Sequence, residues 1–153
     1  MKTRMLQKAG ILILPFIALL LELLPYGAVL NFGDLGEDGT VRTIRVTRSY
    51  FDPLPFGYGN CGPLLTAALT CVLSFLVILF FLLQKEPLWK AAGVTASVSI
   101  AASLLPLYFG LSCFSVFGAV ISLILIAERV LLILCRGRRD ETVSAQEERS
   151  RKK

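Results

Sequence analysis

The chain contains no histidine and has few charged residues. Asp, Glu, Lys and Arg together make up 18% of its 153 residues, against about 25% in an average soluble domain. The absence of histidine excludes histidine-ligated metal sites and mechanisms in which histidine carries the proton. The four cysteines form no Cys-x-x-Cys pair, the spacing typical of zinc sites and thiol redox motifs. We therefore expect no metal site, no cofactor and no enzymatic activity.

Apolar residues, in contrast, are abundant and are gathered in long runs. They make up 55% of the chain, and the mean hydropathy is +0.70. A hydrocarbon layer about 30 Å thick needs about 20 mostly apolar helical residues. Four runs meet this length and predict transmembrane helices over 9–30, 62–83, 91–109 and 111–135. The expected fold class is an all-α integral membrane protein, a bundle of four transmembrane helices.

The first run also shares features with a secretory signal peptide, namely a basic start followed by apolar residues. We expect it to be retained as a helix, because it continues past Glu22 and no Ala-x-Ala cleavage site follows it. Cleavage would leave three spans with the same orientation.

The basic residues are distributed unevenly around these runs. Twelve of the 16 Lys and Arg residues fall in 1–8, 84–90 and 136–153, and three fall in the loop 31–61. Short segments rich in Lys and Arg stay in the cytoplasm. We therefore expect a multi-pass protein of the cell (inner or plasma) membrane, with both termini cytoplasmic and near anionic lipid. Nucleic-acid binding is not expected, because the basic residues gather at span ends instead of alternating with aromatic residues.

The loop 31–61 is the largest segment expected in water apart from the basic C-terminal tail. Its first part is rich in glycine, and the pair Asp38-Gly39 suits a hairpin turn into the β-branched stretch 40–51. Alternation along this stretch leaves neither side apolar, so we expect a short exposed β-hairpin instead of a core strand. The rest of the loop is interrupted by prolines and carries aromatic residues suited to the lipid–water interface.

Small residues determine how the spans can pack, because helices in lipid associate through close approach and hydrogen bonds. The run 91–109 has small residues on nearly every face, which predicts a central helix that contacts several neighbours. The run 111–135 has one stripe of small residues at helical spacing, formed by Ser115, Gly118, Ala119 and Ser122. Any of these faces also suits contact with a second copy of the chain or with a membrane partner protein.

Glu22 is the residue that points most directly to chemistry. A carboxyl group inside a span is costly and often functional. At comparable depth the other predicted spans offer the hydroxyl groups of Thr70, Ser99, Ser103 and Ser122. A protonatable carboxyl group surrounded by hydroxyls suits proton-coupled transport. The structural alternative is a neutral glutamate bonded to a serine or to a carbonyl group that Pro25 leaves free.

Glu128 and Arg129 lie near the inner end of the run 111–135. Neighbouring residues on a helix point about 100° apart, so these two are not expected to pair with each other. We expect them to anchor the helix at the interface, and the alternative is an ion pair with another helix.

Cys61 and Cys113 both fall near the outer surface of the predicted bundle. A disulfide between them is one interpretation, since extracytoplasmic compartments are oxidising. The other is that both cysteines are unpaired and fill apolar space.

Two hypotheses about function follow. Ample packing surface and sparse chemistry favour a non-enzymatic four-span protein that serves as a structural or partner subunit of a membrane assembly. The alternative is a small proton-coupled transporter or channel that uses Glu22.

Overall fold

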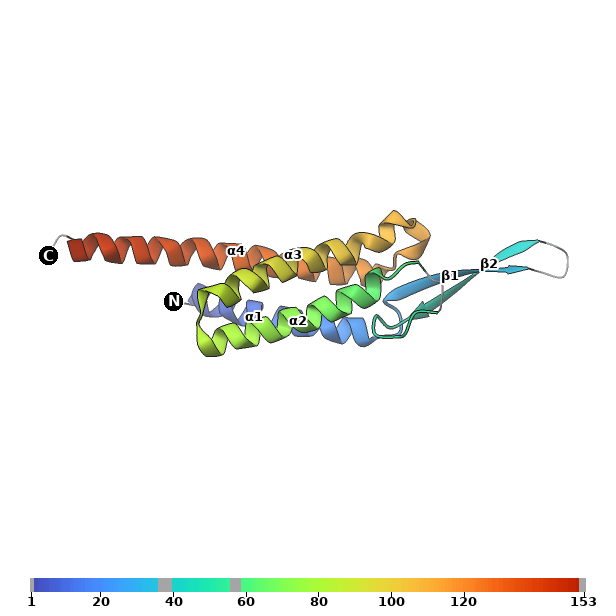
Figure 1. Cartoon of the computed structure of the whole chain (residues 1–153), viewed down its shortest axis with the longest axis horizontal. Coiled ribbons are helices and arrows are strands. Elements are labelled where there is room, and N and C mark those ends of the chain that lie inside the picture. The colour runs from blue at the N-terminus through green and yellow to red at the C-terminus, as the bar shows by residue number, and fades with distance from the viewer. Residues whose placement is uncertain (1, 36–39, 56–58, 152–153) are drawn as a thin grey trace.

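The computed structural model describes residues 2–35, 40–55 and 59–151, with side chains for 6–34, 40–55 and 59–136. Four helices lie side by side along the long axis, and a pair of strands projects beyond one end (Figure 1). Both termini lie at the opposite end. We call these the hairpin end and the terminal end. The elements are α1 (Lys2–Leu23), β1 (Ala28–Leu35), β2 (Val41–Arg48), α2 (Gly62–Leu83), α3 (Glu86–Tyr108), the 3-10 helix η1 (Leu111–Cys113) and α4 (Val116–Arg151).

Within the described residues, four helices are long and apolar enough to cross a membrane, as the sequence predicts. The qualifying segments are Leu6–Leu23, Gly62–Leu83, Glu86–Tyr108 and Val116–Arg136. At about 1.5 Å per residue, each of them is about 27–35 Å long, which matches a hydrocarbon layer.

The first helix is shorter than predicted. We expected a helix over 9–30, but α1 ends at Leu23 and residues 28–30 belong to β1. Pro25 accounts for this difference, because proline lacks the N–H of a helical residue and disfavours the helical conformation of the residue before it. The last turn closes with a hydrogen bond from the Leu24 N–H to the Leu21 carbonyl oxygen, at 3.2 Å.

The predicted turn 84–90 is also shorter than expected. Only Gln84 and Lys85 separate α2 from α3, and Pro87 lies in the first turn of α3. Proline is accepted there because the first N–H groups of a helix have no partner within the helix. The two helices therefore pack as antiparallel neighbours.

The last helix starts later than predicted and continues further. Instead of beginning at 111, α4 begins at Val116, after η1, and it extends to Arg151 through most of the basic tail. Ser115 caps its first turn, since its Oγ accepts a hydrogen bond from the Gly118 N–H at 2.8 Å. The same Oγ donates to the carbonyl oxygen of Gly27, which ties the start of α4 to the segment after α1.

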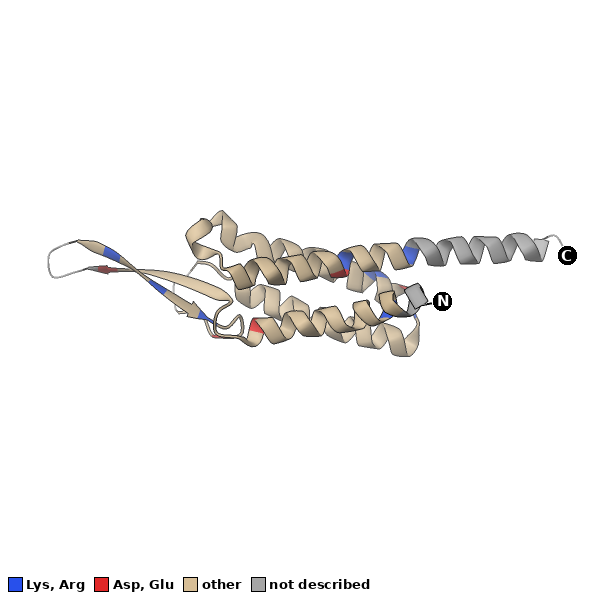
Figure 2. Cartoon of the chain, turned by 180° about the vertical axis from the view of Figure 1, so that it is seen from behind, with Lys and Arg blue, Asp and Glu red and all other residues tan. Residues whose placement is uncertain are grey.

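The expected hairpin is present, and it begins within the first predicted span. β1 and β2 pair antiparallel, from Ala28 opposite Arg48 to Leu35 opposite Val41. The first three residues of β1 are buried against the hairpin end of the bundle, whereas β2 is exposed along almost its whole length. The twisted ribbon carries basic residues outward (Figure 2). The turn predicted at Asp38-Gly39 falls outside the described residues.

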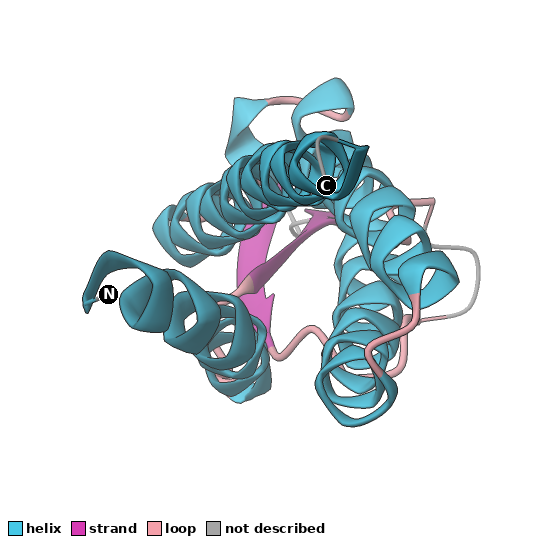
Figure 3. Ribbon diagram, turned by 90° about the vertical axis from the view of Figure 1, so that its left-hand side faces the viewer, coloured by secondary structure: helices cyan, strands magenta, loops and turns pink. Residues whose placement is uncertain are grey.

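The four helices surround a shared core in sequence order (Figure 3). α1 packs mainly against α2 and α4, and α3 packs mainly against the same two helices. The prediction of a central third helix is therefore wrong. Each helix therefore packs against two neighbours in the ring, which leaves one of its faces outside. On α3 that face carries the exposed side chains of Val94, Val98 and Leu104.

Candidate functional site

The core of the bundle is partly polar. Two carboxyl groups, on Glu22 of α1 and Glu128 of α4, are 0% exposed. They share the interior with buried hydroxyl groups from α2, α3, α4 and the residue before α4, namely Thr66, Thr70, Ser74, Ser99, Ser103, Ser115 and Ser122. A buried charge without a partner is costly, so these two carboxyl groups are the strongest candidates for a functional role.

Glu22 lies at the hairpin end of α1, and helical spacing directs its side chain into the core. Ile11, Pro15, Ala18 and Glu22 are all buried. Steps of three and four residues place them on one face of the helix, directed at the core. Glu22 is the next-to-last residue of α1, so it ends this buried stripe just before the chain turns into β1.

Thr70 of α2 is the hydrogen-bond partner of Glu22. Its Oγ1 lies 2.9 Å from Oε1 of Glu22 and also 2.9 Å from the carbonyl oxygen of Thr66. The second carboxyl oxygen, Oε2 of Glu22, is buried and has no hydrogen-bond partner among the described residues. Thr70 is the one residue of the predicted hydroxyl set that the structure brings to Glu22.

This arrangement links the threonine proton to the protonation state of Glu22. A hydroxyl group has one proton to donate, and Thr70 has two acceptors within reach. When Glu22 is charged, Thr70 donates to the carboxylate. When Glu22 is neutral, the acid can donate to Thr70, which then donates to the Thr66 carbonyl oxygen. The pair can therefore exchange a proton without losing all its hydrogen bonds.

Tyr50, a residue to which no sequence pattern points, covers the site at the hairpin end. Its side chain is 2% exposed. A Cβ added at Gly27 would lie 2.9 Å from the tyrosine ring, and one added at Gly118 would lie 3.1 Å from its Oη. The ring thus fits between two glycines, one after α1 and one on α4. No local pattern in the sequence indicates which aromatic side chain of the loop packs there.

Backbone contacts hold this cover to the end of α1. The Tyr50 N–H and the Ser49 hydroxyl both donate to the carbonyl oxygen of Glu22, at 3.0 and 2.9 Å. Burial, and secondly the negative charge that Glu22 carries when ionised, raise the pKa of the Tyr50 phenol above its usual range. Tyr50 therefore stays neutral at physiological pH.

The other predicted hydroxyl groups are buried but belong to different hydrogen bonds. Ser122 Oγ donates to Ser103 Oγ at 2.9 Å and joins α4 to α3. Ser99 Oγ donates to the carbonyl oxygen of Thr95 within α3, also at 2.9 Å. Ser99, Ser103 and Ser122 therefore contribute to the polar lining of the core and not to the pair formed by Glu22 and Thr70.

Glu128 does not anchor α4 at an interface as predicted. It lies between Leu125 and Leu132, which are 0% and 1% exposed, on the buried face of α4. Steps of three and four residues put all three side chains on that face. Neither carboxyl oxygen of Glu128 has a hydrogen-bond partner in the described part of the chain. The guanidinium group of Arg129 lies instead against α3, with Nη1 2.8 Å from the position of a Cβ at Gly93.

Cys61 and Cys113 are free thiols in the structure. Cys61 is exposed, and Cys113 accepts a hydrogen bond at Sγ from the side-chain amide of Asn31, at 3.3 Å. Both thiols are therefore unpaired in the structure, but the exposed Cys61 does not fill apolar space inside the bundle. Cys113 helps to hold β1 against η1.

Comparisons of the chain with protein-family models, with curated proteins and with solved structures found no match. Within the described residues, no group of three or more Cys, Asp or Glu side chains is placed to hold a metal ion. The carboxyl groups of Glu22 and Glu128 are both buried, and a carboxyl group can bind and release one proton.

Proposed function

We propose that this chain is a small integral membrane protein that takes up and releases protons at Glu22, as a proton-coupled transporter or channel does. The observation that carries the proposal is the fully buried carboxyl group of Glu22, with one oxygen on Thr70 and the other without a partner among the described residues. An ionisable group inside a transmembrane bundle is by default a candidate for ion or proton movement.

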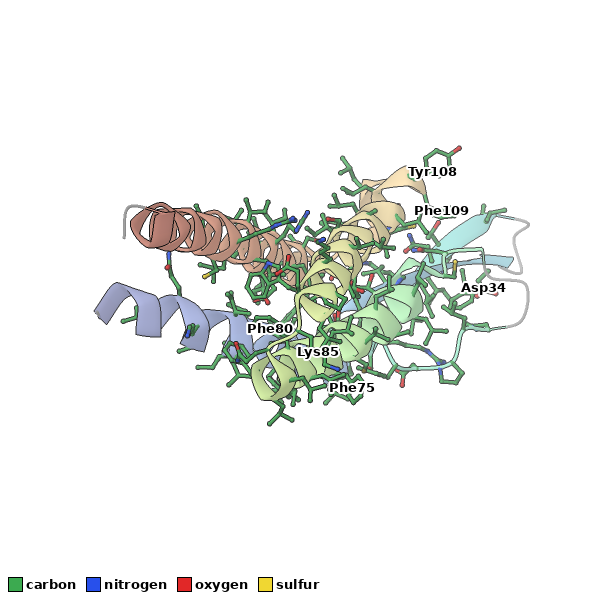
Figure 4. All side chains as sticks on the ribbon, turned by 60° about the vertical axis from the view of Figure 1, so that its left-hand side comes forward. Asp34, Phe75, Phe80, Lys85, Tyr108 and Phe109 are labelled. Atoms are coloured by element: carbon green, nitrogen blue, oxygen red, sulfur yellow. The ribbon has the colours of Figure 1, made fainter. Side chains whose placement is uncertain are left out.

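The outer faces of the helices support insertion into a membrane. Each helix exposes large apolar side chains, among them Leu20, Phe75, Val94 and Leu123. Figure 4 shows Phe75 pointing away from the core. Tyr108, at the hairpin end of α3, is 88% exposed and projects outward, as aromatic residues do at a lipid–water interface. Water would disfavour such a surface, whereas lipid would not.

The charges support one orientation in that membrane. Lys8, Lys85, Lys90 and Arg136 all belong to the terminal end of the helices. The side of the membrane protein with the excess of Lys and Arg residues is retained in the cytoplasm. We therefore infer that the protein lies in the cell membrane, with both termini in the cytoplasm and the hairpin on the outer side.

Glu22→Gln is expected to abolish proton movement. The protein would be reconstituted in liposomes with a pH gradient, and the decay of the gradient would be followed with an enclosed pH-sensitive dye. The wild type is expected to dissipate the gradient, and Glu22→Gln is expected to decay at the rate of protein-free liposomes. Thr70→Val should give an intermediate rate, because Glu22 keeps its proton but loses its hydrogen-bond partner.

Glu86→Gln is the matched control, since Glu86 is an exposed glutamate in the first turn of α3. It should leave the decay rate unchanged. A wild type no faster than empty liposomes, or a Glu22→Gln variant as fast as the wild type, would refute the proposal.

A second candidate function, that of a partner subunit in a membrane assembly, is favoured by the hairpin. A ribbon of two strands is only marginally stable alone, and exposed strand edges readily pair with another chain. Beyond its buried start, the described part of this ribbon is exposed on both faces of β2 and carries exposed Arg45 and Arg48. A partner with an acidic surface would fit it.

Photo-crosslinking at Ile44 tests this second candidate. Ile44 is 47% exposed on β2, and Leu82, 73% exposed at the terminal end of α2, is the matched control position. A photoreactive residue at 44, activated in native membranes, should give a discrete product of higher mass, and the same residue at 82 should not. If position 44 yields only the monomer, the hairpin is not a docking element.

A further inference from the structure

Glu128 occupies a position that packing alone does not explain. Its neighbours on the buried face of α4 are Leu125 and Leu132, one turn to each side, so a leucine at 128 would continue the apolar stripe. Both oxygens of its carboxyl group are instead buried without a hydrogen-bond partner among the described residues. Such groups lose their hydration without compensation. A side chain that opposes stability at a core position suggests a role beyond packing.

Among the side chains that the structure describes, none provides a fixed counter-charge for Glu128. α4 packs against α1 and α3. The charged side chains described on these three helices are Lys8, Glu22, Glu86, Lys90, Glu128, Arg129 and Arg136. Of these only Glu22 and Glu128 are buried, and Arg129 extends toward Gly93. The neutral acid is therefore the form of Glu128 that this packing accommodates.

Glu128 also lies at a different place along the bundle from Glu22. Glu22 is at the hairpin end of its span, Leu6–Leu23, whereas Glu128 lies past the midpoint of Val116–Arg136, toward the terminal end. The hydrogen bond between Ser122 and Ser103 lies between Glu128 and the hairpin end of α4. The two carboxyl groups thus lie at different depths in the bundle, Glu22 nearer the hairpin end and Glu128 nearer the terminal end.

We propose that Glu128 is a second proton-binding site, which exchanges its proton with water at the terminal end while Glu22 exchanges with the hairpin end. This proposal rests on the proposed function of Glu22. Binding of one proton converts the Glu128 carboxylate to the neutral acid, and release returns that proton to water. Two such sites at different depths divide the apolar barrier into shorter steps.

Labelling with dicyclohexylcarbodiimide tests the site without any transport measurement. This hydrophobic reagent forms a stable adduct with protonated carboxyl groups in apolar surroundings, and peptide mass spectrometry locates the adduct. Glu128 should be labelled in the wild type and equally in Glu22→Gln, whereas exposed Glu86 should not be. Labelling of Glu128 in Glu22→Gln does not depend on whether Glu22 moves protons. This result therefore tests the Glu128 site separately from the proposed function. Absence of an adduct on Glu128 overturns the proposal.

The side of access is tested in membrane vesicles of the two orientations, with a buffered interior and varied external pH. Labelling of Glu128 should follow the external pH only when the termini face outward. If it follows the pH on the hairpin side, the assignment of the two ends is wrong.

Glu128→Leu separates this role from a structural one. Leucine should match the apolar stripe, so the thermal midpoint in detergent should equal or exceed that of the wild type, while proton movement in liposomes is lost. A lower midpoint for both Glu128→Leu and the isosteric Glu128→Gln would show that the carboxyl group is needed for folding and would overturn the proposal.

Discussion

Tyr50→Ala is expected to destabilise the protein by about 3–5 kcal/mol, the usual loss when a large buried aromatic side chain is truncated. Tyr50 is 2% exposed, and its ring fills the space between Gly27 and Gly118. Glycine cannot fill the cavity from either side. The loss would appear as a lower midpoint of unfolding, by heat or by added sodium dodecyl sulfate, in mild detergent.

Two variants delimit this effect. Tyr50→Phe keeps the ring and should retain most of the stability. Tyr108→Ala removes the same side chain where it is 88% exposed, and it should leave the midpoint close to that of the wild type. If Tyr50→Ala and Tyr108→Ala have the same midpoint of unfolding, the Tyr50 ring does not stabilise the hairpin end.

Gly62→Leu is expected to cost about 3 kcal/mol, the upper part of the usual range for overpacking. Gly62 is the first residue of α2 and faces α3. A Cβ at this position would lie 2.9 Å from Cδ of Pro106 and 3.1 Å from the carbonyl oxygen of Ala102. A proline ring and a helix backbone cannot swing aside, so α2 and α3 would have to separate.

Smaller substitutions give the matched comparison. Gly62→Ala should lose part of the same stability in the same unfolding measurement. Gly59→Ala, three residues earlier, places its Cβ at an ordinary 3.7 Å from Phe109, and it should change the midpoint little. Equal midpoints for Gly62→Ala and Gly59→Ala would contradict the close approach of α2 and α3.

The elements that the sequence predicted well are those set by local physical chemistry. A run of 22 residues without charge, as in α2, has few structures open to it other than a buried or membrane helix. The hairpin follows from β-branched residues and a turn signal. The first span is shorter than apolar character predicts, because that character continues to Leu30 whereas Pro25 prevents α1 from continuing beyond Leu23.

The polar core was predictable only in part. Depth along the spans associates Thr70 with Glu22, but it equally associates Ser99, Ser103 and Ser122, which make other hydrogen bonds. Depth alone misplaced Glu128, although its spacing from Leu125 and Leu132 already put it on one face with two leucines. The position of Tyr50 depends on contacts with Gly27 and Gly118, 23 and 68 residues away along the chain. Such distant packing leaves no trace in hydropathy or periodicity.

The junction between the ribbon and α1 has a mechanical consequence. β2 ends at Arg48. The next two residues, Ser49 and Tyr50, both donate hydrogen bonds to the carbonyl oxygen of Glu22. A force applied to the projecting strands is therefore transmitted to Glu22, whose carboxyl group is buried in the core. A partner that binds the projecting strands could therefore shift the position of the Glu22 carboxyl group inside the bundle.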